Sequence, residues 1–563
     1  SNVSREAIFD VDIPGKAFIS NFSMEINGTT YYGEVRAKSY SQQQYDESKR
    51  LGASAGQITA KPNAYNKFNI AVNVAAMQKI TFNLTYDELL ERRAGIYNHE
   101  IYINPGQPVR DVQVKVTIQE TRAIKDVSVP TLTTEIPSVI KRDQPTPKTA
   151  NIQFSPTTSQ QGDGGLAGKF IVRYDVERDY SVGDVYVVDG YFVHFFAPNI
   201  TEEFPRDILF MLDTSTSMAD RKLGQLKDAM TVIIKELSEQ DRFNILVFNT
   251  QQTFWADGFQ PVTSGTKSKA LKFIKNLRTN QSNLISDTDI QAALVKGFSM
   301  FEKDPEGVPM VFLLTDGEPT KGNTRPRSII HWVKSANTQK IPIYSLAFGK
   351  GSDWDLMYRI AFDSGGVARR IFEGSSASLQ IAQFYKEVSK VLLEDITIQY
   401  SNLNNGTKVS NERSIFKEDT DSILLGGTEI VIAGQVQDNS NYIDLVIAAN
   451  SVNGPIAMKA QENDDEDGMH IDNASNILER LWAYLTIKEY LETTAASGTR
   501  GGDRNKAERL ALKYGFVTPT TSMFISPSAT NLWKTYDEDY NEFHLRTARP
   551  SKILIFLLPS KLF

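Results

Sequence analysis

Residues 207–217 have the sequence DILFMLDTSTS, in which an apolar run is followed by Asp213 and then by four hydroxyl residues. An apolar run of this kind is typical of a parallel strand that is covered on both faces. The loop after such a strand lies at the carboxyl edge of the sheet, where open α/β folds bind their ligands. The carboxylate of Asp213 and the hydroxyls of Ser215 and Ser217 are hard oxygen donors, which suit Mg²⁺, Mn²⁺ or Ca²⁺.

Two further segments are predicted to complete a metal site with this loop. Residues 311–317 (VFLLTDG) form a second apolar run that ends at Asp316, and Thr288 opens a predicted helix over 288–301. Only two members of the resulting set are anionic, and Mg²⁺ prefers six oxygen ligands. The ion would therefore keep water, which a carboxylate from a partner protein could replace. The predicted metal residues are Asp213, Ser215, Ser217, Thr288 and Asp316.

The residues around this site alternate between strand and helix patterns. Residues 242–249 and 341–348 are predicted strands, and apolar residues recur at helical spacing over 223–237 and 267–277. This alternation predicts a doubly wound, Rossmann-like parallel sheet with right-handed crossovers over residues 204–394.

The rest of the chain is predicted to be mainly β, with helices near its C-terminal end. An Asn27-Gly28 pair between two strand patterns indicates a hairpin, and residues 128–148, rich in Pro, Thr and Ser, indicate a loop-bearing connector. Residues 124–203 and 395–460 are predicted to form one β unit, a sandwich around the inserted α/β domain, because neither segment can bury much core alone. The predicted division is 1–123 (β-rich), 124–203, 204–394, 395–460, 461–530 (helical) and 531–563 (tail).

Composition limits the classes of function. The chain has 563 residues, a net charge of −7 and no cysteine. It lacks the basic character of a general nucleic-acid binder, and no apolar run approaches the ~20 residues that span a bilayer. Cysteine nucleophiles, thiolate metal sites and disulfides are excluded. Eight Asn-X-Ser/Thr sequons are candidate glycosylation sites and favour secretion mildly: Asn2, Asn21, Asn27, Asn83, Asn199, Asn280, Asn405 and Asn473.

Catalysis is not expected. The five histidines are scattered, and no H-E-x-x-H, G-x-S-x-G or P-loop motif is present. Ser215 and Ser217 have no base adjacent in sequence, which favours metal ligation over nucleophilic attack. We therefore predict that the protein is not an enzyme.

The D-x-S-x-S loop, the T-D-I-x-x-A-L segment and the T-D-G end resemble the metal-ion-dependent adhesion site (MIDAS) of von Willebrand factor A domains. The resemblance implies that Ser215, Ser217 and Thr288 touch the metal directly, while Asp213 and Asp316 act mainly through water. Two positions depart from the family pattern: Thr216 replaces a common glycine, and Asp289 replaces a common asparagine. The second change adds negative charge beside the metal, which is expected to weaken the binding of a partner carboxylate.

Six motifs in order resemble the inter-alpha-trypsin inhibitor heavy chains, in which a vault-protein/inter-alpha-trypsin (VIT) domain precedes an A domain. The likeness extends to about residue 530, and the first strands of the VIT domain are expected to be missing. The motifs are residues 15–22 (GKAFISNF), 80–90 (ITFNLTYDELL), 190–198 (GYFVHFFAP), 365–371 (GGVARRI), 479–487 (ERLWAYLTI) and 516–523 (FVTPTTSM).

This resemblance implies a secreted plasma or hemolymph glycoprotein that associates with hyaluronan and stabilises extracellular matrix. Protease inhibition in the family belongs to a separate Kunitz-type light chain, which a heavy chain can carry. The sequence has no D-P-H-F motif, so covalent transfer to hyaluronan is not expected. The alternative is an intracellular scaffold with VIT and A domains. Glycan occupancy at Asn83 or Asn199 would distinguish the two.

Overall fold

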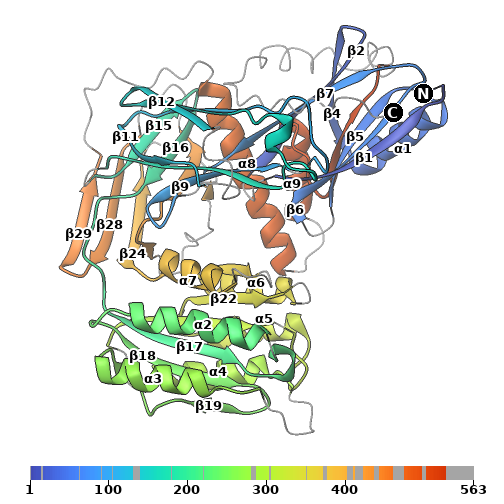
Figure 1. Cartoon of the computed structure of the whole chain (residues 1–563). Coiled ribbons are helices and arrows are strands. Elements are labelled where there is room, and N and C mark those ends of the chain that lie inside the picture. Colours follow the sequence, from blue (N-terminus) through green and yellow to red (C-terminus); the bar gives the residue numbers. More distant parts are fainter. Residues whose placement is uncertain are drawn as a thin grey trace.

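The structure is a computed structural model, and Figure 1 shows an α/β domain below a β-rich body, with the N-terminal domain at the upper right. The described residues are 2–13, 17–61, 64–90, 92–103, 105–130, 140–178, 181–219, 221–279, 287–302, 306–316, 318–349, 352–371, 377–401, 410–411, 423–436, 443–460, 474–497 and 502–527.

A parallel sheet forms the centre of the α/β domain. Its strand β17 is buried along its whole length and lies between β18 and β21, parallel to both. Strands β22 and β23 continue the sheet in parallel, whereas β19 and β20 pair antiparallel with β18. The bounds are β17 (Arg206–Asp213), β18 (Arg242–Phe248), β19 (Gln252–Phe254), β20 (Gln260–Pro261), β21 (Val308–Thr315), β22 (Ile343–Phe348) and β23 (Ala368–Ile371).

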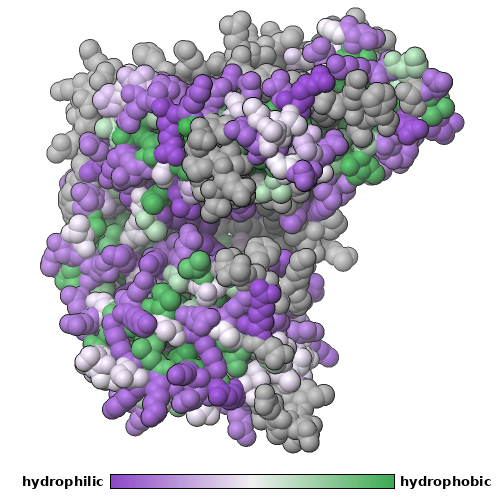
Figure 2. Space-filling view, in the orientation of Figure 1, coloured by the Kyte–Doolittle hydropathy of each residue, from purple (hydrophilic) through white to green (hydrophobic). Residues whose placement is uncertain are grey.

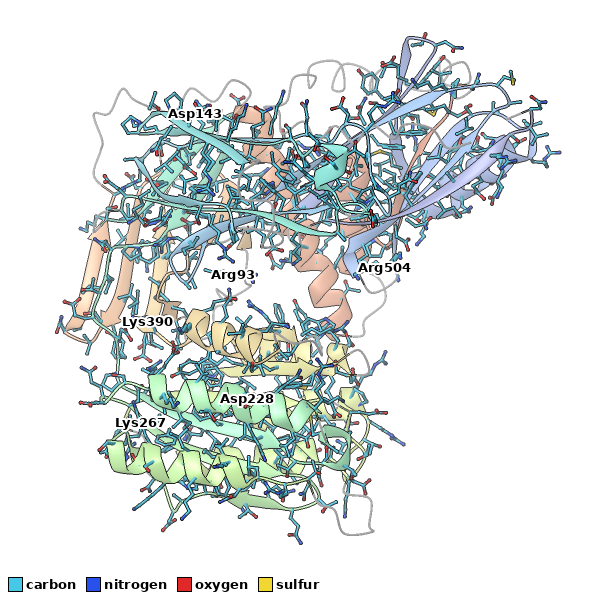
Figure 3. All side chains as sticks on the ribbon, viewed as in Figure 1. Arg93, Asp143, Asp228, Lys267, Lys390 and Arg504 are labelled. Carbon is cyan, nitrogen blue, oxygen red and sulfur yellow. The ribbon has the colours of Figure 1, made fainter. Side chains whose placement is uncertain are left out.

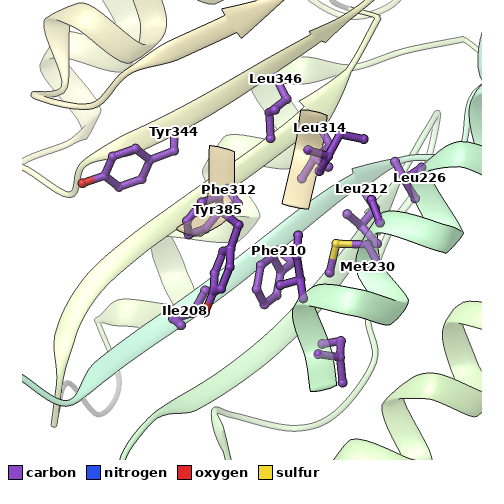
Figure 4. Close-up of a cluster of buried hydrophobic side chains, with 14 of the residues drawn as sticks. Ile208, Phe210, Leu212, Leu226, Met230, Phe312, Leu314, Tyr344, Leu346 and Tyr385 are labelled. Carbon is purple, nitrogen blue, oxygen red and sulfur yellow. The ribbon is translucent and has the colours of Figure 1, made fainter. Parts of the chain in front are cut away.

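Helices cover both faces of this sheet, so the domain has three layers. Residues of α2, α3 and α7 share one core with the sheet, and residues of α4, α5 and α6 share the other. Figure 4 shows the first core, where Phe210 and Phe312 pack beside Tyr385 of α7. The predicted doubly wound fold is confirmed. The helices are α2 (Arg221–Glu236), α3 (Ser264–Asn276), α4 (Ile290–Phe301), α5 (Pro326–Ala336), α6 (Trp354–Asp363) and α7 (Ala377–Val388).

The N-terminal domain packs a five-stranded sheet against a three-stranded one. The larger sheet has the order β1-β6-β5-β30-β4 and the smaller the order β3-β2-β7, and both contribute to one core. Asn27 and Gly28 both have positive φ and connect β2 to β3, as the predicted hairpin requires. The elements are β1 (Arg5–Asp12), β2 (Ala17–Ile26), β3 (Thr29–Tyr32), β4 (Glu34–Ala37), α1 (Lys38–Arg50), β5 (Ala55–Lys61), β6 (Ala64–Val74) and β7 (Ile80–Glu88).

One strand of the N-terminal domain comes from the far end of the chain. Strand β30 (Thr521–Ile525) pairs antiparallel with both β4 and β5, and all five of its residues are buried. The region predicted as helical, 461–530, therefore contains a strand as well as its helices α8 (Ala474–Ser497) and α9 (Gly502–Tyr514). Within the described residues, no helix has the length and apolar character needed to cross a membrane.

Two further β units connect the N-terminal domain to the α/β domain. The first has a core shared by the sheets β10-β13-β12 and β11-β14-β9-β8. Because β9 and β10 pair with β14 and β13, the strands before residue 123 do not all belong to one domain, unlike the predicted division. The strands are β8 (Arg92–Arg93), β9 (Ile96–Ile103), β10 (Val114–Gln119), β11 (Ile124–Ser128), β12 (Ile140–Thr146), β13 (Thr149–Phe154) and β14 (Gly168–Val176).

The second unit combines strands from both sides of the α/β domain. Strand β16 pairs with β27, and residues of β16, β24, β27 and β28 share one core. At the junction, the Phe204 N–H donates to the carbonyl of Val391 at 2.9 Å, and Lys390 forms an ion pair with Glu203. The strands are β15 (Asp184–Val188), β16 (Tyr191–Phe196), β24 (Val391–Tyr400), β25 (Ser410–Asn411), β26 (Leu424–Leu425), β27 (Ile430–Gln435), β28 (Leu445–Ser451) and β29 (Gly454–Lys459).

Side-chain polarity follows this architecture. Hydrophilic residues predominate over the face of the α/β domain seen in Figure 2, outside the helices whose inner sides form the core. Labelled charged residues in Figure 3 include Asp228 on α2 and Lys267 on α3, while Lys390 marks the junction with the β-rich body.

His194 of β16 is buried in the unit that combines strands from both sides. Its Nε2 lies 2.6 Å from the Val182 carbonyl and its Nδ1 lies 2.7 Å from the Tyr400 hydroxyl. The carbonyl can only accept, so Nε2–H donates to it and Nδ1 accepts from Tyr400 in the neutral ring. Burial lowers the pKa of His194 to about 4.

We expect His194 to make the protein less stable in acid. Unfolded His194 takes up a proton below pH 6.5 and the folded form only near pH 4, so stability falls as pH falls between these values. The contribution from pH 6.5 to 4.5 should be about 2 kcal/mol of unfolding free energy. Urea unfolding at both pH values should show this loss in wild type and not in His194→Gln. His331→Gln, on the exposed side of α5, should behave as wild type.

Candidate metal centre

The predicted metal residues lie at the carboxyl edge of the parallel sheet. Strands β17 and β21 are adjacent and parallel, with Leu212 opposite Leu314, so Asp213 and Asp316 follow at the same edge. In the order β18-β17-β21-β22-β23, the chain goes from β17 to the neighbour on one side and then to the neighbour on the other side. The helices α2 and α4, which follow β17 and precede β21, lie on opposite faces of the sheet. Ligands of open α/β sheets bind outside such a switch point.

Asp213 is fixed and fully buried at the end of β17. Its Oδ1 accepts from the Ser215 N–H at 2.8 Å, and its Oδ2 accepts from the Thr315 hydroxyl at 2.5 Å. Burial raises the pKa of Asp213 to about 6, against these hydrogen bonds, which lower it, and with a smaller upward effect of Asp316. A cation would favour the ionised form.

The two serines of the loop lie together beside Asp213. The hydroxyls of Ser215 and Ser217 are 3.0 Å apart; Ser215 is buried and Ser217 is exposed. Ser217 lies within a short 3-10 helix, Thr216–Met218, and Ser215 is its N-cap. The loop thus presents two neighbouring neutral oxygens to a solvent-accessible edge.

Thr288 belongs to the same region through its backbone neighbours. It is buried, its N–H donates to the Thr320 hydroxyl at 2.8 Å, and its carbonyl accepts from the Thr320 N–H at 3.1 Å. Asn249 connects this segment to the serine loop: its carbonyl accepts from the Asp289 N–H, and its side chain donates to Thr214 Oγ1 at 3.3 Å. Thr288 is not joined to Ser215, Ser217 or Asp316 by a hydrogen bond.

The surroundings of the Asp316 carboxylate point to a bound cation. Its Oδ1 is buried and has no hydrogen-bond partner in the described part of the chain. Its Oδ2 lies 3.3 Å from Nζ of Lys222, near the start of α2. A buried carboxylate oxygen without a partner is costly, and a bound cation or its water would satisfy it.

The donor set fits a hard divalent ion. It consists of two carboxylates and three hydroxyls, all oxygen, as Mg²⁺ and Ca²⁺ prefer. Across the described ranges, no group of three or more His, Cys, Asp or Glu side chains is placed to hold a metal. A cation at this edge would therefore depend on the hydroxyl oxygens.

Sequence reasoning missed three residues of this region: Thr315, Lys222 and Asn249. The Thr315 hydroxyl holds Asp213, and Lys222 approaches Asp316. Thr315 is the threonine of the T-D-G motif and could have been considered, since a hydroxyl at a strand end can bond to a neighbouring strand. Nothing in the local sequence pairs Lys222 or Asn249 with this edge.

Asp289 has a structural role in addition to its charge. It is the N-cap of α4, where its Oδ1 accepts from the Ala292 N–H at 2.9 Å. Gly322 packs against its other side with φ +68°, and a Cβ there would lie 2.5 Å from Asp289 Oδ2. The helix N-terminus offsets part of the negative charge that this residue adds.

Five of the eight candidate glycosylation residues belong to the described part of the chain. Asn2, Asn27, Asn83 and Asn199 are exposed, and Asn21 is half-buried in β2. Asn280, Asn405 and Asn473 lie outside the described residues, as do His470 and His544. Exposure makes a site accessible and does not test its modification.

Comparisons with known proteins agree with the fold and motifs. A von Willebrand factor type A domain model matches residues 206–370, and a vault protein inter-alpha-trypsin domain model matches residues 1–86. The ArnB paralog VWA2 of Sulfolobus acidocaldarius has a solved structure with a TM-score of 0.39 and 13% identity; the match covers 57% of this chain and 83% of that one.

The sequence relatives extend across nearly the whole chain. Human inter-alpha-trypsin inhibitor heavy chain H4 is 36% identical over 544 residues, which is 93% of this chain and 57% of that protein. Bos taurus heavy chain H3 is 33% identical over 557 residues, covering 94% of this chain and 60% of that protein. The chain thus spans about three-fifths of the length of these curated relatives.

The fold and the two domain matches define a protein with a von Willebrand factor type A domain and a VIT domain. In sequence it is a relative of the inter-alpha-trypsin inhibitor heavy chains, and the resemblance expected from its six motifs is confirmed.

We expect Asp213→Asn to abolish stabilisation by Mg²⁺. The amide keeps the size of the side chain and can still accept from Ser215 N–H, but it removes one of the two charges available to an ion. Wild type should gain about 2.7 kcal/mol at 100 times the dissociation constant. In EDTA the variant should be at least as stable as wild type, because a buried charge is gone.

Thermal melting with and without Mg²⁺ measures this effect. Asp228→Asn is the matched control, because Asp228 is exposed on α2 of the same domain (Figure 3). A Mg²⁺-dependent shift that survives in Asp213→Asn would contradict the assignment.

Lys222→Gln should bind Mg²⁺ several-fold more tightly than wild type. Lys222 places a positive charge 3.3 Å from Asp316 Oδ2, where it repels an arriving cation. Calorimetric titration at low salt measures the affinity, and the difference should shrink at higher ionic strength. Lys227→Gln removes the same charge five residues along α2, where Nζ bonds to the Lys275 carbonyl, and should match wild type. Equal affinities for all three proteins would refute the role of Lys222.

Proposed function

We propose that this protein binds partner proteins through one divalent ion, Mg²⁺ under ordinary conditions. In this proposal Ser215, Ser217 and Thr288 contact the ion directly, and Asp213 and Asp316 act behind them through water. The observation that carries the proposal is the buried, unpartnered Oδ1 of Asp316, at the same sheet edge as the paired hydroxyls of Ser215 and Ser217. Mn²⁺ or Ca²⁺ would suit the same oxygen donors.

The partner group is proposed to be an Asp or Glu side chain. Two carboxylates and three neutral hydroxyls leave the ion electrophilic and its coordination shell incomplete. A third carboxylate can replace a bound water at modest cost, because it brings charge to an ion whose ligands are mostly neutral. Ser217 is exposed, so a partner carboxylate can approach the proposed ion from solvent.

The resemblance to the heavy chains extends this proposal to the place where the protein acts and the partners it has there. We propose a secreted glycoprotein of plasma or hemolymph that stabilises hyaluronan-containing matrix and can carry a protease-inhibitor light chain. Support for this part comes from the sequence relatives, which the chain covers in part. Glycans at the exposed Asn83 or Asn199 would favour it over an intracellular scaffold, and their absence from material of the native host would favour the scaffold.

Partner capture from native body fluid, with and without EDTA, tests the adhesive function. We expect capture to require the divalent ion and to be lost in Asp213→Asn. A partner that binds equally well in EDTA would overturn the proposal.

Asp289→Asn should strengthen the EDTA-sensitive interaction by about three- to tenfold. The change removes negative charge near the incoming carboxylate, and asparagine remains a good N-cap for α4. Asp353→Asn is the matched control, because Asp353 caps α6 in the same way, accepting from the Leu356 N–H at 3.0 Å. Surface-immobilised binding of the captured partner measures both affinities. No change in Asp289→Asn would remove the charge argument and leave the metal site itself untouched.

A further inference from the structure

A small cavity lies where the two β units meet, away from the metal centre. Arg92 of β8, Lys125 of β11 and Arg178 after β14 line one side. Leu392 of β24 and the turn after β26 line the other. The cavity volume is about 140 Å³, well below the ~300 Å³ at which pockets for drug-sized molecules begin. Only a small ligand or a terminal group of a larger one would fit.

The charged residues that line this cavity are all cationic, and none of the lining residues is a carboxylate. Three of them, Arg92, Lys125 and Arg178, carry positive charge. Two acidic side chains outside the lining, Asp175 and Glu429, form ion pairs with these cations. The full lining is Arg92, Lys125, Arg178, Pro198, Asn199, Ile200, Leu392, Leu424, Gly427 and Thr428.

Asp175 is largely committed to Arg92. Nε and Nη2 of Arg92 donate to its two carboxylate oxygens, each at 2.9 Å. Nζ of Lys125 is 3.8 Å from Asp175 Oδ2, beyond hydrogen-bond distance, and the Lys125 side chain is 47% exposed. The ammonium of Lys125 can therefore turn toward a ligand without breaking a hydrogen bond to Asp175.

Arg178 is held in place but has an unused donor. Its Nη2 donates to the Tyr97 hydroxyl at 2.6 Å, and its Nη1 lies 3.3 Å from Glu429. Its Nε is buried and has no hydrogen-bond partner among the described residues; the nearest Asp175 oxygen is 3.8 Å away. An unsatisfied buried donor costs about 1–3 kcal/mol. Arg178 lines the cavity, so a small shift of its guanidinium toward an acceptor there would recover this cost.

The charges farther back do not cancel the positive lining. Asp184 pairs with Arg122 at 2.8 Å. Glu120 accepts from the Tyr174 hydroxyl at 2.6 Å, and burial raises the pKa of its carboxyl. Burial likewise raises the pKa of Glu429. The three lining cations form ion pairs with two carboxylates, Asp175 and Glu429, which leaves one positive charge in excess among these pairs.

We propose that this cavity binds a small oxyanion of the phosphate or sulfate type. A positioned guanidinium and a mobile ammonium are the side chains that such an anion needs, and charge-assisted hydrogen bonds are the stronger kind. Water could accept from Arg178 Nε, but it would not balance the charge. The anion could be a free ion or the ester group of a larger molecule. Bound there, it would contact both β units at once.

Titration with inorganic phosphate in EDTA tests the proposal independently of the metal centre. Phosphate should raise the melting temperature more than chloride at equal ionic strength. Lys125→Gln should weaken phosphate binding at least tenfold without unfolding the protein, because Lys125 is half exposed. Lys141→Gln, on the exposed strand β12, should bind as wild type.

Two further measurements sharpen the outcome. Arg178→Lys keeps the charge but loses the fork of donors, and should also weaken binding. O-phosphoserine that competes with phosphate would identify an ester group as an acceptable occupant, and its exclusion would limit the site to the free ion. Stabilisation equal to that by chloride, or unchanged phosphate affinity in Lys125→Gln, would overturn the proposal.

Discussion

The α/β domain enters and leaves the rest of the molecule at one point, where the Phe204 N–H donates to the carbonyl of Val391. The adjacent Glu203 and Lys390 form an ion pair at the same place (Figure 3). Because entry and exit are neighbours, strands on either side of the domain can join one sheet through β16 and β27. The α/β domain can therefore occupy about 190 residues of sequence without separating the two halves of the β unit that carries it.

The same junction relates the metal centre to the rest of the protein. Helix α7 ends at Val388 and β24 begins at Val391, so almost no chain separates the helix from the supporting sheet. Tyr385 of α7 packs against Phe210 of β17 in the domain core, and β17 ends at Asp213. The metal loop and the junction thus lie on opposite sides of one packed core. A structural change at the junction could reach the metal loop only by displacing tightly packed side chains.

The sequence predicted those elements that have a distinctive pattern within a few consecutive residues. The apolar run at 207–213 and the Asn27-Gly28 turn correspond to β17 and to the β2–β3 hairpin. Pairing between distant segments has no such signature. Strand β30 joins β4 and β5 from the other end of the chain. Strand β12 lies within the predicted connector 128–148, and six of its seven residues are exposed, so it has no alternating apolar pattern. For the candidate site, strand ends predicted which side chains share an edge. The contacts of Lys222 and Asn249 depend on tertiary packing, which no spacing rule contains.

The position of β30 has a consequence for the order of folding during synthesis. Strand β5 ends at Lys61, and the strand that must lie beside it begins at Thr521, about 460 residues later. At roughly 5–20 residues per second, the ribosome needs on the order of half a minute or more to supply it. Until then β4 and β5 present open edges next to each other, and such edges are prone to pair with other chains. Of the units in this structure, the N-terminal domain therefore begins to emerge first and is completed last.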